Sequence, residues 1–115
     1  MSVALFDEPI QEKDLDAMAN NARTATDFLK ALGHEGRLMI LCYLADGERS
    51  VTELEELLAA RQPAVSQQLA RLRIEGLVDA RREGKTIYYS IADAKTRKAV
   101  EFLYNMFCRD SATPC

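Results

Sequence analysis

Three cysteines, Cys42, Cys108 and Cys115, are the residues of this chain best suited to react with small molecules. A thiolate can attack sulfur, bind a soft metal ion or be oxidised. None of the three belongs to a Cys-x-x-Cys pair, which argues against a zinc knuckle or a thioredoxin-type motif. The only histidine, His34, has no second histidine beside which to bind a metal ion, so we expect it in a loop or helix cap. Taken singly, Cys42 is better explained as a small buried side chain and Cys108 as a packing residue.

The chain offers little for catalysis or for membrane insertion. It has no glycine-rich phosphate loop and no pairing of a nucleophile with a base, so we expect neither an enzyme nor a cofactor. The N-terminus lacks a secretory signal, and the longest apolar run, residues 38–45, is too short to span a bilayer. We therefore expect a cytoplasmic protein, without a membrane partner, whose cysteines are reduced at rest. A length of 115 residues predicts one domain.

The charges are unevenly distributed along the sequence. The formal net charge is −3, which by itself does not favour a nucleic-acid partner. From residue 61 to residue 85, however, there are six basic and three acidic residues, whereas the remainder has nine basic and fifteen acidic ones. A basic segment on an acidic body is typical of a DNA-binding protein with one contact face.

That basic segment lies in a stretch, residues 51–91, that predicts helix, turn, helix and β-hairpin. Thr52 and Glu55 have the spacing of a capping box for the first helix. In the second helix Val65, Leu69 and Leu72 recur at helical spacing and predict a buried stripe. The hairpin is predicted from basic residues around a glycine turn, followed by the β-branched and aromatic run 86–91.

Opposite the buried stripe, the second helix presents polar side chains. Gln67 and Arg71 point outward, with Ala64 and Gln68 beside them. Amide side chains can pair with adenine, and a guanidinium can pair with guanine or phosphate. An ordinary solvated face is the alternative for such a helix taken alone. A basic hairpin directly after it favours a winged helix-turn-helix, in which the wing contacts the DNA backbone.

At this point the sequence resembles the arsenic-repressor (ArsR/SmtB) family of bacterial transcription factors. Residues 31–41, with their Leu-Gly-His opening, residues 62–69 and residues 76–85 resemble the family's core helix, recognition helix and wing. The resemblance covers roughly residues 14–110. It implies a mainly α fold with a small β-hairpin, in the order α-α-α-α-β-β-α, and a homodimer formed through the first and last helices. Residues 1–13 and 111–115 are then expected to be flexible tails. The DNA-binding residues that we expect are Gln62, Ala64, Ser66, Gln67, Gln68, Arg71, Arg81, Arg82 and Lys85.

The predicted first and last helices carry the apolar patterns that a dimer needs. From Asp14 onward, a seam with heptad spacing runs to Leu32 and includes two alanines. The last helix, capped by Asp93 and extending from about residue 94 to residue 108, is apolar nearly all round in its second half. Such a helix must be covered on two sides. In a chain of this size, a second copy is the natural cover.

The resemblance also bears on the cysteines. Metal-sensing members place cysteines before the recognition helix, or Asp, His and Glu on the last helix, and this chain has neither set, so we expect no metal site. Cys42 and Cys108 instead resemble the cysteine pair of the persulfide-sensing branch, in which reactive sulfur species join the two thiols by a disulfide or a longer sulfur bridge. Cys115 is expected to be dispensable.

The sequence thus predicts a repressor that binds a pseudo-palindromic operator in double-stranded DNA while Cys42 and Cys108 are reduced, and that is released when they are bridged. Three alternatives remain open: a peroxide-responsive thiol switch, an arsenic sensor with cysteine ligands, and a winged-helix module that binds protein.

Overall fold

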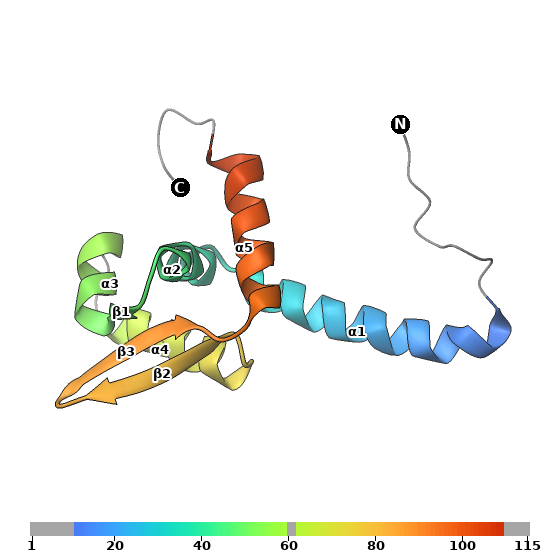
Figure 1. Ribbon diagram of the computed structural model, residues 1–115, viewed down its shortest axis with the longest axis horizontal. Coiled ribbons are helices and arrows are strands. Elements are labelled where there is room, and N and C mark those ends of the chain that lie inside the picture. Colours follow the sequence, from blue (N-terminus) through green and yellow to red (C-terminus); the bar gives the residue numbers. More distant parts are fainter. Residues whose placement is uncertain (1–10, 60–61, 110–115) are drawn as a thin grey trace. The chain divides into compact units, whose positions relative to one another are not determined.

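The structure is a computed structural model that describes residues 11–59 and 62–109. It divides into two compact units after Lys30, and each unit is described by itself. The elements, shown in Figure 1, are η1 (Glu12–Asp14), α1 (Leu15–Leu32), α2 (Glu35–Ala45), β1 (Arg49–Ser50), α3 (Val51–Leu58), α4 (Gln62–Ile74), β2 (Val78–Glu83), β3 (Thr86–Ile91) and α5 (Ala94–Phe107). They follow the predicted order, with a 3₁₀ turn and the short strand β1 in addition. The expected tails lie mostly outside the described residues.

The first unit consists of a 3₁₀ turn and most of helix α1. The predicted seam on α1 is present as an amphipathic face, yet its large side chains are open to solvent. Leu15, Met18 and Leu29 are 52%, 43% and 62% exposed. Exposed leucine and methionine at helical spacing leave this helix with an apolar face that none of the described residues of its own unit, from residue 11 onward, covers.

Helix α2 is the core helix of the second unit. Its side chains Ile40, Leu41 and Leu44 are at most 1% exposed, and α2 packs against α3, α4, α5 and β3. The helix begins after His34, whose Nδ1 accepts hydrogen bonds from the backbone N–H groups of Gly36 and Arg37. The prediction that His34 is a cap residue is confirmed.

Helix α3 begins two residues earlier than the sequence predicts. Its cap is Ser50 and not Thr52: the Ser50 hydroxyl accepts from the Glu53 N–H at 3.2 Å, and the Glu53 carboxylate accepts from the Ser50 N–H at 3.0 Å. This is a complete capping box. The prediction was wrong because Ser50 also belongs to β1, and strand pairing positions Ser50 directly before the helix.

Helix α4 ends in a Schellman motif that leads into the hairpin. The Leu77 N–H donates to the Leu72 carbonyl at 2.9 Å, and the Gly76 N–H donates to the Arg73 carbonyl at 3.0 Å. Gly76 has the left-handed backbone, with a φ of +79°, that this motif requires. The motif buries Leu72 and Leu77 together and directs the chain into β2.

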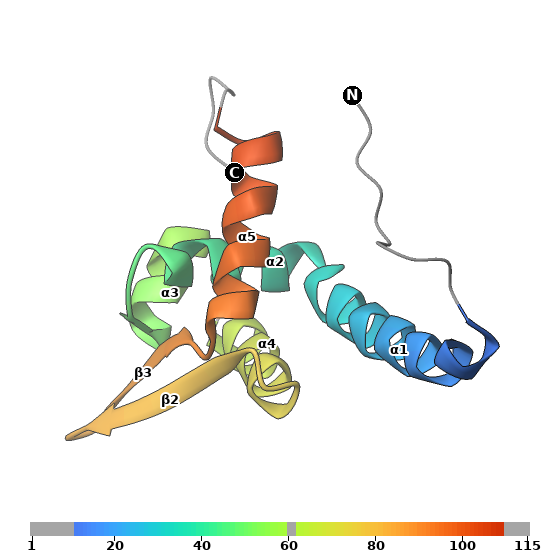
Figure 2. The same cartoon turned by 45° about the vertical axis from the view of Figure 1, so that its right-hand side comes forward.

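Strands β2 and β3 form the predicted wing, which extends beyond the helices (Figure 2). They are antiparallel, and the pairing of Glu83 with Thr86 leaves a loop of Gly84 and Lys85. Gly84 has a φ of +62°, as a two-residue hairpin loop requires. The strand β1, which was not predicted, pairs with β3 and gives the sheet order β1-β3-β2.

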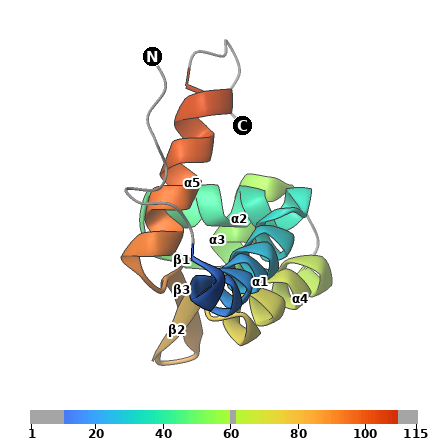
Figure 3. The same cartoon turned by 90° about the vertical axis from the view of Figure 1, so that its right-hand side faces the viewer.

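Helix α5 packs against α2, as Figures 1 and 3 show. Its predicted cap is confirmed: the Asp93 carboxylate accepts from the Thr96 N–H at 2.8 Å, and this bond lowers the pKa of Asp93. One turn later, Arg97 Nη1 donates to the Ala45 carbonyl at 2.7 Å. The start of α5 is therefore fastened to the C-terminal end of α2.

Candidate nucleic-acid interface and cysteine site

The outer face of α4 has the arrangement that the sequence predicts. Val65, Leu69 and Leu72 are at most 2% exposed and form the buried stripe. On the other side of the helix Gln67 and Arg71 are exposed, as is Ala64. Gln67 therefore presents its amide to solvent from a helix that is held firmly by its opposite face. This is the geometry that a base-reading side chain needs.

Gln68 differs from its neighbour Gln67. It is half-buried, and its Oε1 accepts from Arg37 Nη1 at 3.4 Å. Its Nε2 lies 3.5 Å from the Nε2 of His34. Arg37 is itself fixed by a hydrogen bond from its Nε to the Ala31 carbonyl at 2.7 Å. Gln68 thus fastens α4 to the start of α2, and its amide oxygen is occupied.

The remaining predicted contacts of α4 are less constrained. Arg71 forms an ion pair with Glu75, one turn later, at 3.3 Å, and its side chain is 61% exposed. An exposed pair of this kind stabilises a helix weakly, so the guanidinium can exchange its carboxylate partner for a phosphate. Ser66 is half-buried. The side chain of Gln62 lies outside the described part of the chain.

The three basic residues of the wing have different environments. Arg81 is bound to two carboxylates, Glu48 and Glu83. Arg82 uses its Nε to donate to the Gly84 carbonyl at 3.1 Å, which stiffens the turn. Lys85 is exposed at the tip of the hairpin. All three are exposed, but among the described residues only Arg81 has its charge matched by carboxylates, so Arg82 and Lys85 are better placed to contact phosphates.

The two candidate sensor cysteines lie on helices that pack against each other. Cys42 is on α2, half-buried, with a free thiol, and burial raises its pKa. Cys108 caps the C-terminal end of α5 and is 5% exposed. The Cys108 sulfur is in a disulfide bond, and Cys42 is not its partner. The structure contains no bridge between Cys42 and Cys108. Cys115 lies outside the described residues.

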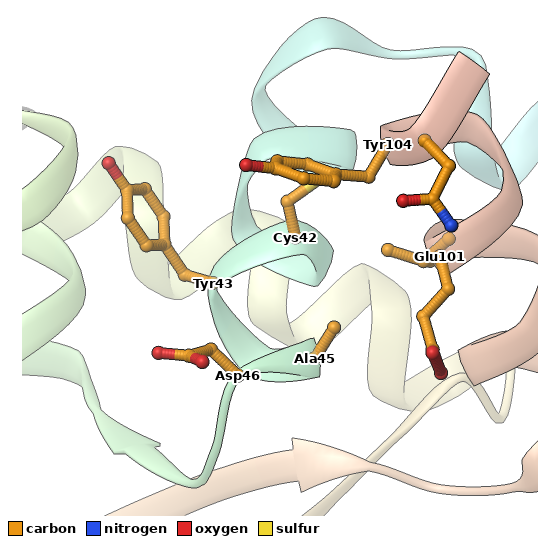
Figure 4. A pocket seen from close by; sticks show the side chains of 8 residues that line it. Cys42, Tyr43, Ala45, Asp46, Glu101 and Tyr104 are labelled. Carbon is orange, nitrogen blue, oxygen red and sulfur yellow. The ribbon is translucent and has the colours of Figure 1, made fainter. Parts of the chain in front are cut away.

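A pocket of about 560 Å³ opens beside Cys42, between α2 and α5. Tyr104, Glu101 and Asn105 of α5 contribute to one wall, and residues of the last turn of α2 form the other. Figure 4 shows Cys42 facing Tyr104 across the junction of the two helices, whereas Tyr43 points toward α3. The pocket gives a small molecule access to a thiol that is otherwise half-buried.

In the parts of the chain that the structure describes, no group of three or more His, Cys, Asp or Glu side chains is placed to hold a metal ion. Within the same residues, no helix is both long enough and apolar enough to cross a membrane.

A buried core helix, an exposed polar helix face and a basic wing define a winged helix-turn-helix DNA-binding regulator. A family model described as bacterial regulatory protein, arsR family, matches residues 34–80. The biofilm growth-associated repressor of Agrobacterium fabrum is 50% identical over 99 residues, which cover 86% of this chain and 85% of that protein. The chain belongs to the ArsR family of bacterial regulatory proteins.

Other relatives agree with this assignment. The transcriptional activator HlyU of Vibrio cholerae is 41% identical over 96 residues, which cover 84% of this chain and 89% of that protein. The structure of reduced HlyU from Vibrio cholerae superposes with a TM-score of 0.78 at 41% identity, over 81% of this chain and 98% of that one. The repressor BigR from Xylella fastidiosa gives a TM-score of 0.76 at 41% identity, over 85% of this chain and 97% of that one.

Sequence reasoning missed the residues that hold the predicted contacts in place. Glu48 binds Arg81, and Arg37 together with His34 binds Gln68, over separations of 33, 31 and 34 residues. Such pairs leave no periodic signal in one sequence. The hint that the sequence offers is the position of Glu48. It directly follows the glycine of a turn, where a carboxylate can reach a neighbouring strand.

Proposed function

We propose that this protein is a transcriptional repressor that binds operator DNA as a homodimer in the cytoplasm. The observation that carries the proposal is the pairing of an exposed, firmly supported α4 face, centred on Gln67, with a wing whose basic tip is open. Similar proteins are named both as repressors and as an activator. We favour repression because the protein with the higher identity, at 50%, is named a repressor.

The inducer in this proposal is a reactive sulfur species, and the sensor is the pair Cys42 and Cys108. Their placement on two packed helices supports this, as does the pocket that gives small molecules access to Cys42. A solved relative is specified as the reduced protein, which is in keeping with a regulator whose thiol state matters.

The chemistry needs two thiols and one persulfide. A cysteine thiolate attacks the outer sulfur of the persulfide R–S–SH, takes up that sulfur and releases the thiol RSH. The second thiolate then attacks the sulfur of the new protein persulfide that is bonded to carbon, which closes a disulfide and expels HS⁻. Each further sulfur atom in the bridge comes from one more persulfide, which again leaves as RSH. The persulfide is the oxidant throughout.

Because burial raises the pKa of Cys42, its thiolate is a minor species near neutral pH.

A bridge between Cys42 and Cys108 would affect DNA binding by changing the position of the recognition helix α4. In a dimer of this class, the two recognition helices must lie about 34 Å apart to enter successive major grooves. A sulfur bridge would fix α5 against α2, which supports α4. A small rotation of the protomers would then lose the register with the operator.

A peroxide-responsive switch at the same two cysteines is the alternative. The two candidates differ in the oxidant and not in the cysteines that respond.

The proposal is tested by measuring DNA binding in both states. An operator duplex would be recovered by selection from a random-sequence library, and its affinity measured by fluorescence anisotropy for the protein reduced with a phosphine and for the protein treated with glutathione persulfide. We expect persulfide to weaken binding at least about tenfold, within the range of allosteric coupling. Equal affinity in the two states would overturn the sensing proposal, and failure to select any duplex would overturn DNA binding.

A further inference from the structure

Arg81 lies in the wing and is half exposed, but each of its three side-chain nitrogens donates to a carboxylate of the protein. Its Nε and Nη2 donate to the two oxygens of Glu48 at 3.1 and 2.7 Å, and its Nη1 donates to Glu83 at 2.9 Å. Its guanidinium also stacks over the ring of Tyr88, 4.9 Å from the ring centroid. We infer that Arg81 is a positioning residue that ties the wing to the C-terminal end of α2 through Glu48, and that it is not a phosphate contact.

The geometry makes an exchange of these carboxylates for DNA unfavourable. All three nitrogens of Arg81 are used, two of them in a fork on a single carboxylate, which is the arrangement that fixes a guanidinium in one orientation. If Arg81 turned to a phosphate, Glu48 and Glu83 would be left as two uncompensated negative charges near the DNA backbone. Like-charge repulsion would then oppose the complex.

The other basic residues of the wing do not have this constraint. Arg82 makes one hydrogen bond, from Nε to the Gly84 carbonyl, so its other two nitrogens point to no acceptor among the described residues. Lys85 follows Gly84 in the turn and is exposed. In this inference the wing contacts phosphates through its tip, whereas Arg81, within β2, fastens the strand to Glu48.

The anchor of Arg81 is connected directly to the proposed sensor helix. Cys42 lies one turn before Ala45, the residue whose carbonyl accepts from Arg97 of α5. Glu48 follows three residues later, and β1 then pairs with β3 of the wing. The end of α2 is thus fastened to α5 on one side and to the wing on the other. This part of the inference rests on the proposed function: bridging Cys42 would shift the wing through Glu48.

The salt dependence of DNA binding by the reduced protein separates the two roles of Arg81. Log affinity falls as log salt rises, and each phosphate contact that is lost makes this fall less steep by about 0.9. We expect Arg82→Ala to reduce the steepness by this amount per contact, and Arg81→Ala to weaken binding without changing the steepness. An equal reduction in steepness for Arg81→Ala would overturn the inference, because it would place Arg81 on a phosphate.

The link to the sensor is tested with Glu48→Gln, which removes the charge and keeps the shape. We expect the ratio of dissociation constants between bridged and reduced protein to shrink at least about threefold. The variant Glu48→Gln with Arg81→Ala should shrink this ratio no further, because the two residues act as one unit. Glu56→Gln, which removes an exposed charge on α3, is the matched control and should leave the ratio unchanged. Thermal unfolding of each variant confirms that it is folded.

Two failures can be told apart. If wild-type protein forms no bridge, the sensing proposal fails, while the salt slopes still decide the role of Arg81. If the bridge forms and Glu48→Gln keeps the full ratio, the sensor acts on DNA binding by another route and the link through Glu48 is wrong.

Discussion

At the scale of single residues, Gln67 and Gln68 show how position decides role. They are adjacent and chemically identical, and the sequence assigns both to DNA. In the structure Gln67 is exposed, whereas Gln68 is half-buried and accepts from Arg37 of α2. One glutamine is available to read a base, and the other joins two helices.

Alanine substitution at the two positions should therefore give opposite results. Gln67→Ala should lower affinity for the selected operator by about 1–3 kcal/mol with little change in affinity for random DNA, as expected for a lost base contact. Gln68→Ala should mainly lower the melting temperature, because it removes a tie between α4 and α2. Anisotropy titrations and thermal melts of the two variants check this. The assignment would be wrong if Gln68→Ala relaxed operator specificity as strongly as Gln67→Ala.

At the level of single residues, some features of the site could be predicted from the sequence and others could not. The stripe of Val65, Leu69 and Leu72 could be predicted because helical periodicity repeats within one element. The partners of Gln68 and Arg81 could not, because they lie on α2 and on the turn after it, more than 30 residues away in the sequence. The sequence pattern identifies candidate DNA-contacting side chains. Only the fold shows which of them are exposed and which are already hydrogen-bonded to other residues of the protein.

At the scale of elements, two overlapping capping boxes compete for the start of α3. Ser50 with Glu53, and Thr52 with Glu55, both fit the sequence pattern. The structure uses Ser50 because it pairs with Tyr88 in the sheet and is thereby placed at the start of the helix. A single sequence cannot show this choice, since the pairing partner belongs to a distant strand.

If Ser50 is the cap of α3, Ser50 and Thr52 should contribute differently to the free energy of unfolding. Ser50→Ala should reduce the free energy of unfolding by about 1 kcal/mol, a common cost of losing an N-cap. Thr52→Ala, at an exposed position inside the helix, should change it by much less. Urea unfolding followed by circular dichroism measures both. A larger loss for Thr52→Ala would contradict the assignment of the cap.

The cap of α5 adds a dependence on pH. The N–H of Thr96 holds the pKa of Asp93 below its usual value, so the folded state binds the proton less readily than the unfolded chain. The stabilisation is fully present above the unfolded pKa of about 4. It is lost as the pH falls through the lower, folded pKa.

Asp93→Asn tests this dependence, because asparagine also caps helices and does not titrate. We expect the stability of wild-type protein relative to Asp93→Asn to fall as the pH is lowered below about 4. Unfolding curves at a series of pH values measure the difference. A constant difference across this range would show that Asp93 does not contribute as a charged cap.

At the scale of the whole molecule, α5 has two distinct faces. Glu101, Tyr104 and Asn105 line the pocket beside Cys42. On the rest of the helix Phe102, Met106 and Phe107 are 61%, 56% and 71% exposed. Large apolar side chains at these exposures indicate an interaction surface. A related winged helix-turn-helix domain from Mycobacterium bovis, 30% identical with a TM-score of 0.65, is described as homodimeric.

A charge placed on this surface should separate the protomers. Phe102→Glu should give a monomer by analytical ultracentrifugation and weaken operator binding, because a single recognition helix contacts only one half-site. Leu57→Glu, at an exposed apolar position of α3, should leave the sedimentation coefficient unchanged. A dimer that persists in Phe102→Glu would place the interface elsewhere.

The central claim is that reactive sulfur joins Cys42 to Cys108, and mass spectrometry tests it most directly. Fully reduced wild type, Cys42→Ser, Cys108→Ser and Cys115→Ser would be treated with glutathione persulfide or with peroxide, and the intact mass and the linked peptides recorded. We predict an intramolecular bridge with added sulfur between the Cys42 and Cys108 peptides, formed with persulfide, retained in Cys115→Ser and absent from the other two variants. An equal bridge with peroxide would indicate a general thiol switch. The absence of any peptide linking Cys42 to Cys108 would contradict the account.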